Sequence, residues 1–279
     1  MRIFVSGATG FLGSHLVPLL RKKKHKLFLL SRSRGGKDFI KGDIGKPNAW
    51  YQKLEKFKPE ATIHLAWEGV ADYQKTPPEV AFLNLENSLE LIKLLSKIGC
   101  KRFVGLGSVM EYSQNLTPFT ASKIALRGFG EALSLASGIQ FLWARPFYVY
   151  GPGQRPQALL PTIINSLLDG KDPEIKNPML VQDFIYVDDV AEALLRIAEM
   201  GQEETKVYEI GRGKAFPIGT IANIAYKQLG LSEPYDESSV SSGDDVTPIA
   251  DIAPLGSLGW MPKTDFKKGI SKMIEFYKS

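Results

Sequence analysis

Short apolar runs alternate with longer amphipathic stretches along the first 150 residues. The apolar runs predict buried strands over Arg2–Ser6, Lys26–Leu30, Asp38–Lys41, Ala61–Ala66, Arg102–Leu106 and Ile139–Ala144. Between them, apolar residues recur at three- and four-residue spacing and predict helices that include Phe11–Arg21, Glu79–Ile98 and Ser122–Ala136. Strands that alternate with helices indicate βαβ units, so we expect an α/β fold in which helices cover both faces of a parallel sheet.

The alternation stops after Pro146, where prolines and glycines become frequent and the elements become shorter. We expect residues 1–150 to form the larger domain, with residues 183–212 returning to it. Residues 151–182 and 213–279 are expected to form a smaller C-terminal α/β lobe. The polar stretch Ser232–Pro254 is expected to be a loop.

The composition is that of an ordinary globular chain of 279 residues with a formal net charge of +5. This charge is too small to require a nucleic-acid partner, but it suits small anionic ligands such as phosphates. A single cysteine, Cys100, excludes an intrachain disulfide, and three scattered histidines argue against a metal site. The chain has no apolar stretch of about 20 residues and no signal-peptide pattern, so we expect a cytoplasmic protein with no membrane partner.

A glycine-rich segment, Gly7-Ala8-Thr9-Gly10-Phe11-Leu12-Gly13, follows the first predicted strand and opens the first predicted helix. Glycines in this position let the backbone turn tightly and approach a pyrophosphate, whose charge meets the free N–H groups of the helix start. The segment therefore predicts a dinucleotide site in a Rossmann-type doubly wound sheet. Its expected cofactor-binding residues are Gly7, Thr9, Gly10, Phe11, Leu12 and Gly13.

The end of the second predicted strand indicates which dinucleotide is preferred. A carboxylate there would bind a ribose 2′-hydroxyl and repel a 2′-phosphate, but the chain continues with Ser31 and Arg32 instead. Because the arginine fork suits phosphate oxygens, NADP(H) is favoured and NAD(H) is the second choice. The alternative is that Arg32 is only a solvated loop residue.

The spacing GxxGxxG resembles the short-chain dehydrogenase/reductase superfamily, and specifically its extended branch of NAD(P)-dependent sugar-nucleotide epimerases, dehydratases and reductases. Further segments match in the same order over nearly the whole chain, namely Gly42–Ile44, His64–Ala66, Asn84, Gly107-Ser108 with Glu111-Tyr112, Arg145–Gly153, Asp183–Val190 and Leu258–Pro262. The resemblance implies a nucleotide-sugar substrate bound by the smaller lobe. It also implies further contacts to the cofactor from Asp43, Ile44, Leu65, Ala66, Trp67, Lys123 and Pro146.

In this superfamily a Ser or Thr, a Tyr and a Lys cooperate, the last two four residues apart on one helix. Ser108 and Lys123 match the first and last of these catalytic positions, but Phe119 stands where the tyrosine is expected. Phenylalanine has no proton to give, and a positioned acid or base contributes about 10²–10⁴-fold to a rate. Three explanations stay open: an introduced substitution, another proton donor such as Tyr148 or Tyr112, or a protein that has lost catalysis.

A second departure from the family pattern, directly after Ser108, reduces the number of possible reactions. Relatives that act as 4,6-dehydratases carry an Asp-Glu pair after the Ser/Thr, where this chain has Val109 and Met110. An NADP(H)-dependent 4-ketoreductase in surface-polysaccharide or deoxysugar biosynthesis is favoured. An NAD-dependent 4-epimerase and a catalytically silent dinucleotide-binding protein are the alternatives.

The expected substrate-binding residues are Ser108, Tyr148 and Arg155, the last of which suits a diphosphate. Two predicted helices, Glu79–Ile98 and Pro118–Ala136, carry more apolar residues than one buried face needs. Relatives use the equivalent helices for a dimer contact, so we expect a homodimer.

Overall fold

The structure, a computed structural model, describes residues 1–201, 207–235 and 247–279. Its centre is a seven-stranded parallel sheet in the order β10-β6-β5-β4-β1-β2-β3. The strands are β1 Arg2–Ser6, β2 Lys26–Ser31, β3 Phe39–Lys41, β4 Ala61–His64, β5 Arg102–Leu106, β6 Gln140–Pro146 and β10 Val207–Ile210. The doubly wound α/β fold predicted from the sequence is confirmed.

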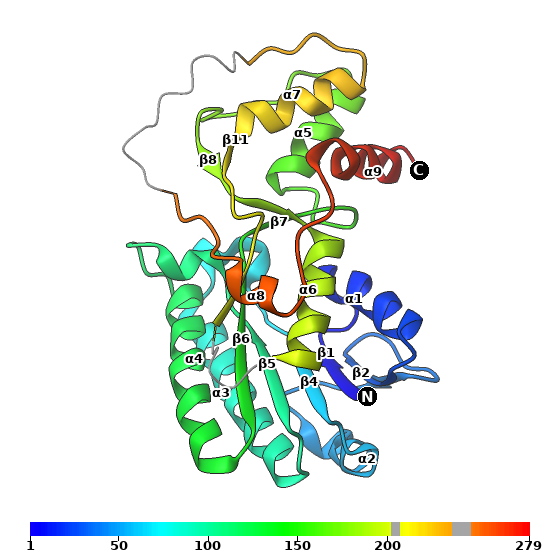
Figure 1. Ribbon diagram of the computed structural model, residues 1–279, viewed down its shortest axis with the longest axis vertical. Coiled ribbons are helices and arrows are strands. Elements are labelled where there is room, and N and C mark those ends of the chain that lie inside the picture. The colour runs from blue at the N-terminus through cyan, green and yellow to red at the C-terminus, as the bar shows by residue number, and fades with distance from the viewer. Residues whose placement is uncertain (202–206, 236–246) are drawn as a thin grey trace.

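Helices cover both faces of this sheet (Figure 1). One face carries α1 (Phe11–Lys22) and α6 (Val187–Met200), and the other carries α3 (Pro78–Lys97) and α4 (Pro118–Ser137), with the short α2 (Tyr51–Phe57) before β4. Successive residues of a strand point to opposite faces. Thus Ile3 and Val5 of β1 join the core under α1 and α6, whereas Phe4 joins the core under α3 and α4.

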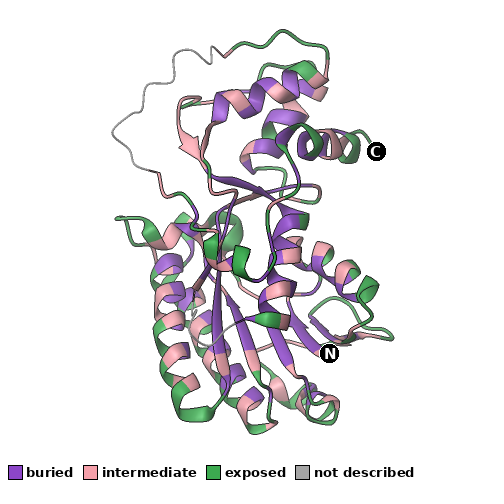
Figure 2. Cartoon of the chain, in the orientation of Figure 1, coloured by how far each residue is buried: buried purple, intermediate pink, exposed green. Residues whose placement is uncertain are grey.

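A smaller lobe lies beyond the carboxyl ends of the strands, at the top of Figure 1. It contains the helices α5 (Leu159–Leu168), α7 (Ile218–Gln228) and α9 (Phe266–Lys278), which share a third hydrophobic core. Two small sheets join this lobe to the rest, β7 (Tyr148–Tyr150) with β9 (Phe184–Tyr186) and β8 (Val181–Gln182) with β11 (Phe216–Pro217). The strands of the seven-stranded sheet are largely buried, and so are the inner helix faces of both lobes, whereas β8 and β11 are only partly buried (Figure 2).

Differences from the predicted elements have local causes. The helix predicted from Ser122 begins at Pro118, because Thr117 and Thr120 cap its first turn. Within Ser232–Pro254, predicted as a loop, residues 236–246 lie outside the described residues, and the short helix α8 (Ala253–Ser257) begins just before its end. The predictions missed α2, whose seven residues are too few to show a clear period.

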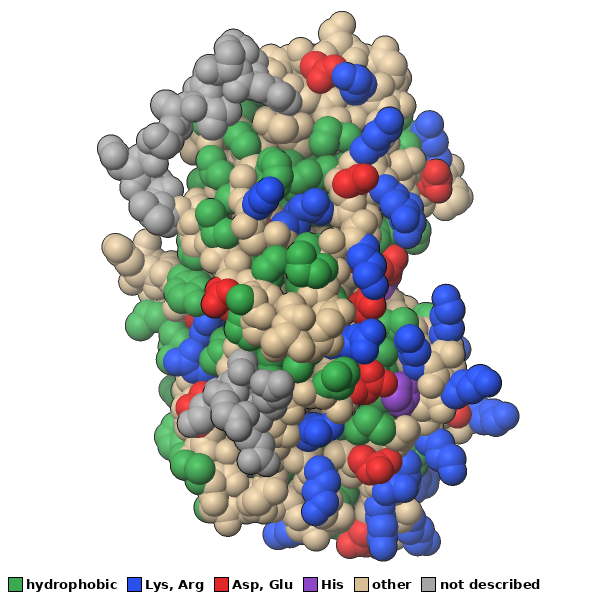
Figure 3. Space-filling view, viewed as in Figure 1, with side chains coloured by type: hydrophobic (Ala, Val, Ile, Leu, Met, Phe, Trp, Pro, Cys, Tyr) green, Lys and Arg blue, Asp and Glu red, His purple; other side chains and the backbone are tan. Residues whose placement is uncertain are grey.

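The surface charge and the helix lengths add two observations. Lys and Arg side chains gather around the larger lobe on the side of α1 (Figure 3), where residues 21–24 are all exposed. Across the three described ranges, no helix is long and apolar enough to cross a membrane.

Candidate functional site

The glycine-rich loop between β1 and α1 is packed too tightly for side chains. Gly7 has a φ of +70°, and a Cβ atom there would lie 2.7 Å from the backbone nitrogen of Ala66. A Cβ atom at Gly13 would overlap the carbonyl oxygen of Gly7. Helix α1 then starts at Gly10 with no side-chain cap and no acidic residue in its first turn. The loop therefore presents backbone N–H groups at a helix start, as an anion site requires.

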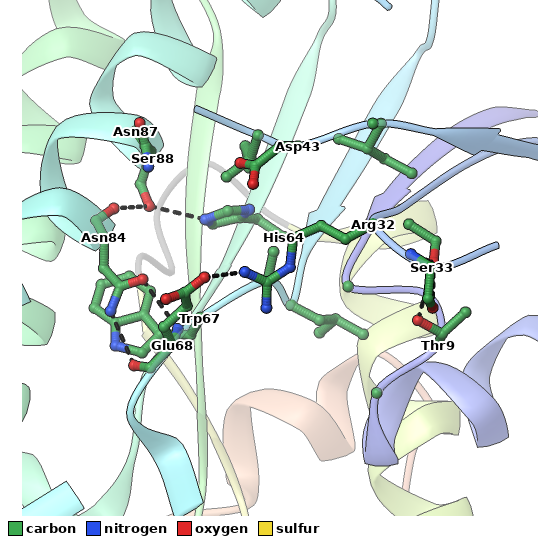
Figure 4. A pocket seen from close by; sticks show the side chains of 18 of the residues that line it. Thr9, Arg32, Ser33, Asp43, His64, Trp67, Glu68, Asn84, Asn87 and Ser88 are labelled. Atoms are coloured by element: carbon green, nitrogen blue, oxygen red, sulfur yellow. Dashed lines mark hydrogen bonds and ion pairs between the residues drawn. The ribbon is translucent and has the colours of Figure 1, made fainter. Parts of the chain in front are cut away.

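Beside this loop, a pocket of about 410 Å³ runs along the carboxyl ends of β1, β2 and β4 (Figure 4). Ten of the residues predicted to bind the cofactor line it, namely Gly7, Thr9, Gly10, Ser31, Arg32, Asp43, Ile44, Leu65, Ala66 and Trp67. The other predicted contacts, Phe11, Leu12, Gly13, Lys123 and Pro146, are not among the described lining residues. The expected cofactor contacts did not include the wall contributed by α3, where Asn87 and Ser88 lie beside Asn84, a residue noted only as matching the family.

An ion pair closes one side of this pocket. The Arg32 guanidinium donates to the carboxylate of Glu68, which follows β4, and both side chains are about half exposed (Figure 4). Asn84 holds the backbone of Glu68 from both sides, because its Oδ1 accepts from the Glu68 N–H at 3.0 Å and its Nδ2 donates to the Glu68 carbonyl at 2.9 Å. Glu68 was not anticipated from the sequence, since nothing local to it indicates that the chain returns it to Arg32.

A buried hydroxyl–imidazole chain forms the floor of the pocket. His64 Nδ1 lies 2.7 Å from Ser6 Oγ, and its Nε2 lies 2.9 Å from Ser88 Oγ. Ser88 Oγ donates to the carbonyl of Asn84, so it accepts from His64 Nε2–H, and Nδ1 in turn accepts from Ser6. Burial, and to a smaller extent the charge of Lys123, lowers the pKa of His64 to about 3. His64 is therefore a neutral positioning group.

Ser108 is fixed by a buried ion-pair cluster. Its backbone N–H donates to Glu111 Oε1 at 2.8 Å, and Trp143 Nε1 donates to the same oxygen at 3.0 Å. Arg145 holds Glu111 Oε2 at 2.9 Å and Glu209 Oε1 at 3.0 Å. Since β5, β6 and β10 are neighbours, these strands bring together carboxylates that lie far apart in the sequence. The cluster leaves the Ser108 hydroxyl at the carboxyl end of β5.

Lys123 and Phe119 lie on the first turns of α4, against the pocket wall. Lys123 Nζ donates to the Leu106 carbonyl at 2.6 Å and lies 3.5 Å from the centroid of the Trp67 ring. Burial lowers the pKa of Lys123 to about 7, although the charge of Glu111 opposes this change. Phe119 is 5% exposed and packs edge-on against Trp67. Lys123 thus reaches the strand that leads to Ser108 and also the ring that lines the pocket.

The remaining predicted residues lie on the side of the smaller lobe. Tyr148 is the first residue of β7; burial raises the pKa of its phenol, and a hydrogen bond with Gln182 acts against this. Arg155 is exposed in the loop after β7. The Tyr112 hydroxyl donates to Glu209, and burial, followed by that bond, raises its pKa. Tyr112 therefore belongs to the ion-pair cluster around Ser108.

The residues present fit a dinucleotide. The glycine loop turns so closely against the backbone of Ala66 and against itself that it leaves no room for side chains, and the buried Trp67 Nε1 has no hydrogen-bond partner among the described residues. A ligand in the pocket would give this donor an acceptor. Within the described ranges, no group of three or more His, Cys, Asp or Glu residues is placed to hold a metal ion.

The sheet, the glycine loop and the pocket define a Rossmann-type dinucleotide-binding protein. More narrowly, the chain belongs to the NAD dependent epimerase/dehydratase family of sugar-nucleotide modifying enzymes, whose model matches residues 3–211. The resemblance seen in the sequence is thereby confirmed.

Known proteins similar to this chain include enzymes named for different reactions on sugar nucleotides. A CDP-abequose synthase of Salmonella typhimurium is 27% identical, with 98% of this chain and 97% of that protein covered. The structure of a UDP-glucose 4-epimerase of Thermotoga maritima with UDP-glucose matches with a TM-score of 0.85 at 24% identity, covering 100% and 99% of the two chains. The structure of MoeE5 with UDP-glucuronic acid and NAD matches with a TM-score of 0.84 at 26% identity, with the same coverage.

Proposed function

We propose that the protein is an NADP(H)-dependent oxidoreductase that reduces the 4-keto group of a nucleotide-linked sugar. The main support for this proposal is the position of the buried Lys123 amine, which lies between the pocket residue Trp67 and the strand that ends before Ser108. The dinucleotide, when bound, supplies the hydride. The Ser108 hydroxyl donates a hydrogen bond to the sugar oxygen on which charge develops, and Lys123 binds the ribose next to the nicotinamide.

The residues after Ser108 favour reduction over dehydration. Val109 is 4% exposed and packs with Phe147 and Ala250, and Met110 packs against the same cluster. Val109 and Met110 stand at the positions where dehydratases of the family carry their acid–base pair. Since none of these side chains moves a proton, elimination of water from the sugar lacks its catalysts.

In this proposal the two lobes bind different ligands. Residues 1–150, together with 183–212, bind the cofactor, and residues 151–182 with 213–279 bind the nucleotide sugar. Tyr148 contacts the sugar and Arg155 the diphosphate, for which its exposed guanidinium is well suited. The products would serve surface-polysaccharide or deoxysugar biosynthesis.

The preference for NADP(H) rests on Arg32. Its partner Glu68 has to release it before the guanidinium can bind a 2′-phosphate, but an ion pair this exposed contributes only about 0–1 kcal/mol. Arg32→Ala should therefore weaken NADP⁺ binding in titration calorimetry by about tenfold or more and leave NAD⁺ binding nearly unchanged. Tighter binding of NAD⁺ than of NADP⁺ by the wild type would instead favour the cofactor seen with MoeE5.

The proposed activity is tested by NADPH oxidation against a panel of nucleotide-linked 4-keto sugars. We expect turnover with at least one member and, for Ser108→Ala, a loss of about 10²-fold with unchanged NADPH affinity. Interconversion of two 4-hydroxy sugars without net NADPH consumption would identify a 4-epimerase. Binding of both ligands without any turnover would identify a silent dinucleotide-binding protein.

A homodimer through α3 and α4 accompanies this proposal. Both helices expose large apolar side chains, with Phe82 70%, Phe129 58% and Leu135 83% exposed. Burying them against a second copy removes an apolar surface that a monomer would leave in water. Light scattering should give a dimer for the wild type and a monomer for Phe82→Asp/Phe129→Asp; a monomeric wild type would contradict the assignment.

A further inference from the structure

Phe119 leaves the site without its expected phenol, but a different tyrosine packs against the Phe119 ring. Tyr73 lies in the short 3₁₀ segment Val70–Lys75 that follows the pocket-lining residues after β4. Its ring centroid is 5.8 Å from the centroid of Phe119, at an interplanar angle of 53°. Lys123 Nζ is also 5.8 Å from that centroid. Tyr73 and Lys123 therefore both contact the ring that replaces the catalytic tyrosine.

The Tyr73 hydroxyl is held only loosely within the protein. Among the described residues, its only hydrogen-bond partner is the exposed Gln74 amide, whose Nε2 donates to it at 3.5 Å, the weak limit for such a bond. Tyr73 is partly buried, and its ring is held in place against Phe119. The Tyr112 hydroxyl, by contrast, is engaged by Glu209 and by Arg145 at 2.8 Å.

Tyr73 also lies near Tyr148, which we propose contacts the sugar. An ionised Tyr73 would raise the pKa of Tyr148, so the two phenols lie within electrostatic reach of each other. Tyr148 begins β7, the strand that leads into the smaller lobe, and its hydroxyl is already bonded with Gln182. Between these two phenols, Tyr73 is the one without a strong partner.

We propose that Tyr73 is a catalytic residue that supplies the proton which Phe119 lacks. This inference rests on the proposed keto-sugar reduction. As hydride from the reduced nicotinamide forms a C–H bond at the keto carbon, the Tyr73 O–H bond breaks and its proton forms the new O–H bond on the sugar. The resulting phenolate regains a proton from water, which reaches a partly buried side chain.

The test compares Tyr73→Phe with Tyr51→Phe, which removes a phenol from α2 outside the pocket lining. Tyr73→Phe keeps the ring and its packing on Phe119, so a purely structural tyrosine would tolerate it. We expect kcat for the keto sugar to fall about 10²-fold or more, with KM and NADPH affinity unchanged. Tyr51→Phe should leave kcat unchanged. Adding Phe119→Tyr to Tyr73→Phe should restore much of the loss, because the phenol returns to the position that the family uses.

A second readout needs neither cofactor nor substrate. In protein labelled with ¹³C at the tyrosine Cζ, the Tyr148 signal should titrate at lower pH in Tyr73→Phe than in the wild type, because the neighbouring charge is gone. An unchanged Tyr148 titration would overturn the placement of Tyr73.

The activity outcomes separate the two proposals. Wild-type turnover that Tyr73→Phe retains, or a Tyr73→Phe defect in KM alone, overturns the role of Tyr73 and leaves the proposed reductase intact. Wild-type protein that binds NADPH and every keto sugar of the panel without turnover overturns both.

Discussion

The buried Lys123 should make the protein less stable than it would be with an apolar residue at this position. The residue is 3% exposed, and burial lowers the pKa of its amine from 10.5 to about 7. Each unit by which a pKa shifts corresponds to about 1.4 kcal/mol, so burying the charged amine lowers the free energy of unfolding by about 5 kcal/mol at neutral pH. The hydrogen bond to Leu106 and the contact with Trp67 offset part of it. Lys123→Met loses these contacts, yet we expect it to raise the free energy of unfolding at pH 7.

The sign of the pH dependence follows from proton linkage. Between pH 7 and 10.5 the unfolded chain binds a proton at Lys123 that the folded chain has released, so wild-type stability rises with pH in this window. Lys123→Met lacks this contribution. The stability advantage of the variant should therefore shrink by about 1.4 kcal/mol per pH unit above pH 7 and become constant below it.

Urea denaturation of the protein without cofactor, followed by tryptophan fluorescence at several pH values from about 7 to about 10, measures this difference. Lys53→Met, which removes an exposed lysine of α2, is the matched control and should show no pH-dependent difference from the wild type. A difference between the wild type and Lys123→Met that stays flat across this range would show that Lys123 keeps an ordinary pKa, and the argument from burial would be wrong.

Three further predictions concern groups that shape the site. His64 is neutral in the folded chain and gains a proton on unfolding below pH 6.5. The free energy of unfolding should therefore fall by about 1.4 kcal/mol per pH unit as the pH drops from 6.5 towards 3. In urea denaturation His64→Gln should lack this contribution, and an equal pH dependence in both proteins would contradict the prediction. Glu111→Gln removes one of the two carboxylates that pair with the buried Arg145 and should lower the free energy of unfolding by about 3 kcal/mol. Glu209→Gln should cost less, because the Glu209 carboxylate is more exposed. Equal urea midpoints for the two variants would count against this ranking. Gly13→Ala places a Cβ atom against the glycine loop and should weaken dinucleotide binding at least about tenfold in calorimetry, whereas Gly256→Ala, with open space around it, should not.

The parts of the site that the sequence predicted are those encoded locally. The glycine loop needs only a strand, a helix and small residues between them, so Gly7, Gly10 and their neighbours were identified from a single segment. Lys123 was identified by its resemblance to the lysine of the superfamily's Tyr-Lys pair, whose two positions lie four residues apart on one helix. These features depend on chain neighbours within about one turn.

The parts that were missed are made by pairing between distant segments. Glu68 and Arg32 meet because β1 lies between β2 and β4 in the sheet, an order that the sequence does not state. The partners of Arg145 on β6 come from its two neighbours in the sheet, Glu209 from β10 and Glu111 from the segment that follows β5. The position of Tyr73 depends on how a short 3₁₀ segment folds back over α4, which has no sequence signature.

Transfer of hydride from the cofactor to a sugar is the central claim, and isotope labelling tests it most directly. The protein is incubated with NADPH that carries deuterium at the transferring position and with each nucleotide-linked 4-keto sugar, and the products are analysed by mass spectrometry. The account predicts a reduced sugar nucleotide that carries one deuterium on carbon. If calorimetry shows that both ligands bind and yet no labelled alcohol forms with any sugar of the panel, the chain does not carry out this reaction.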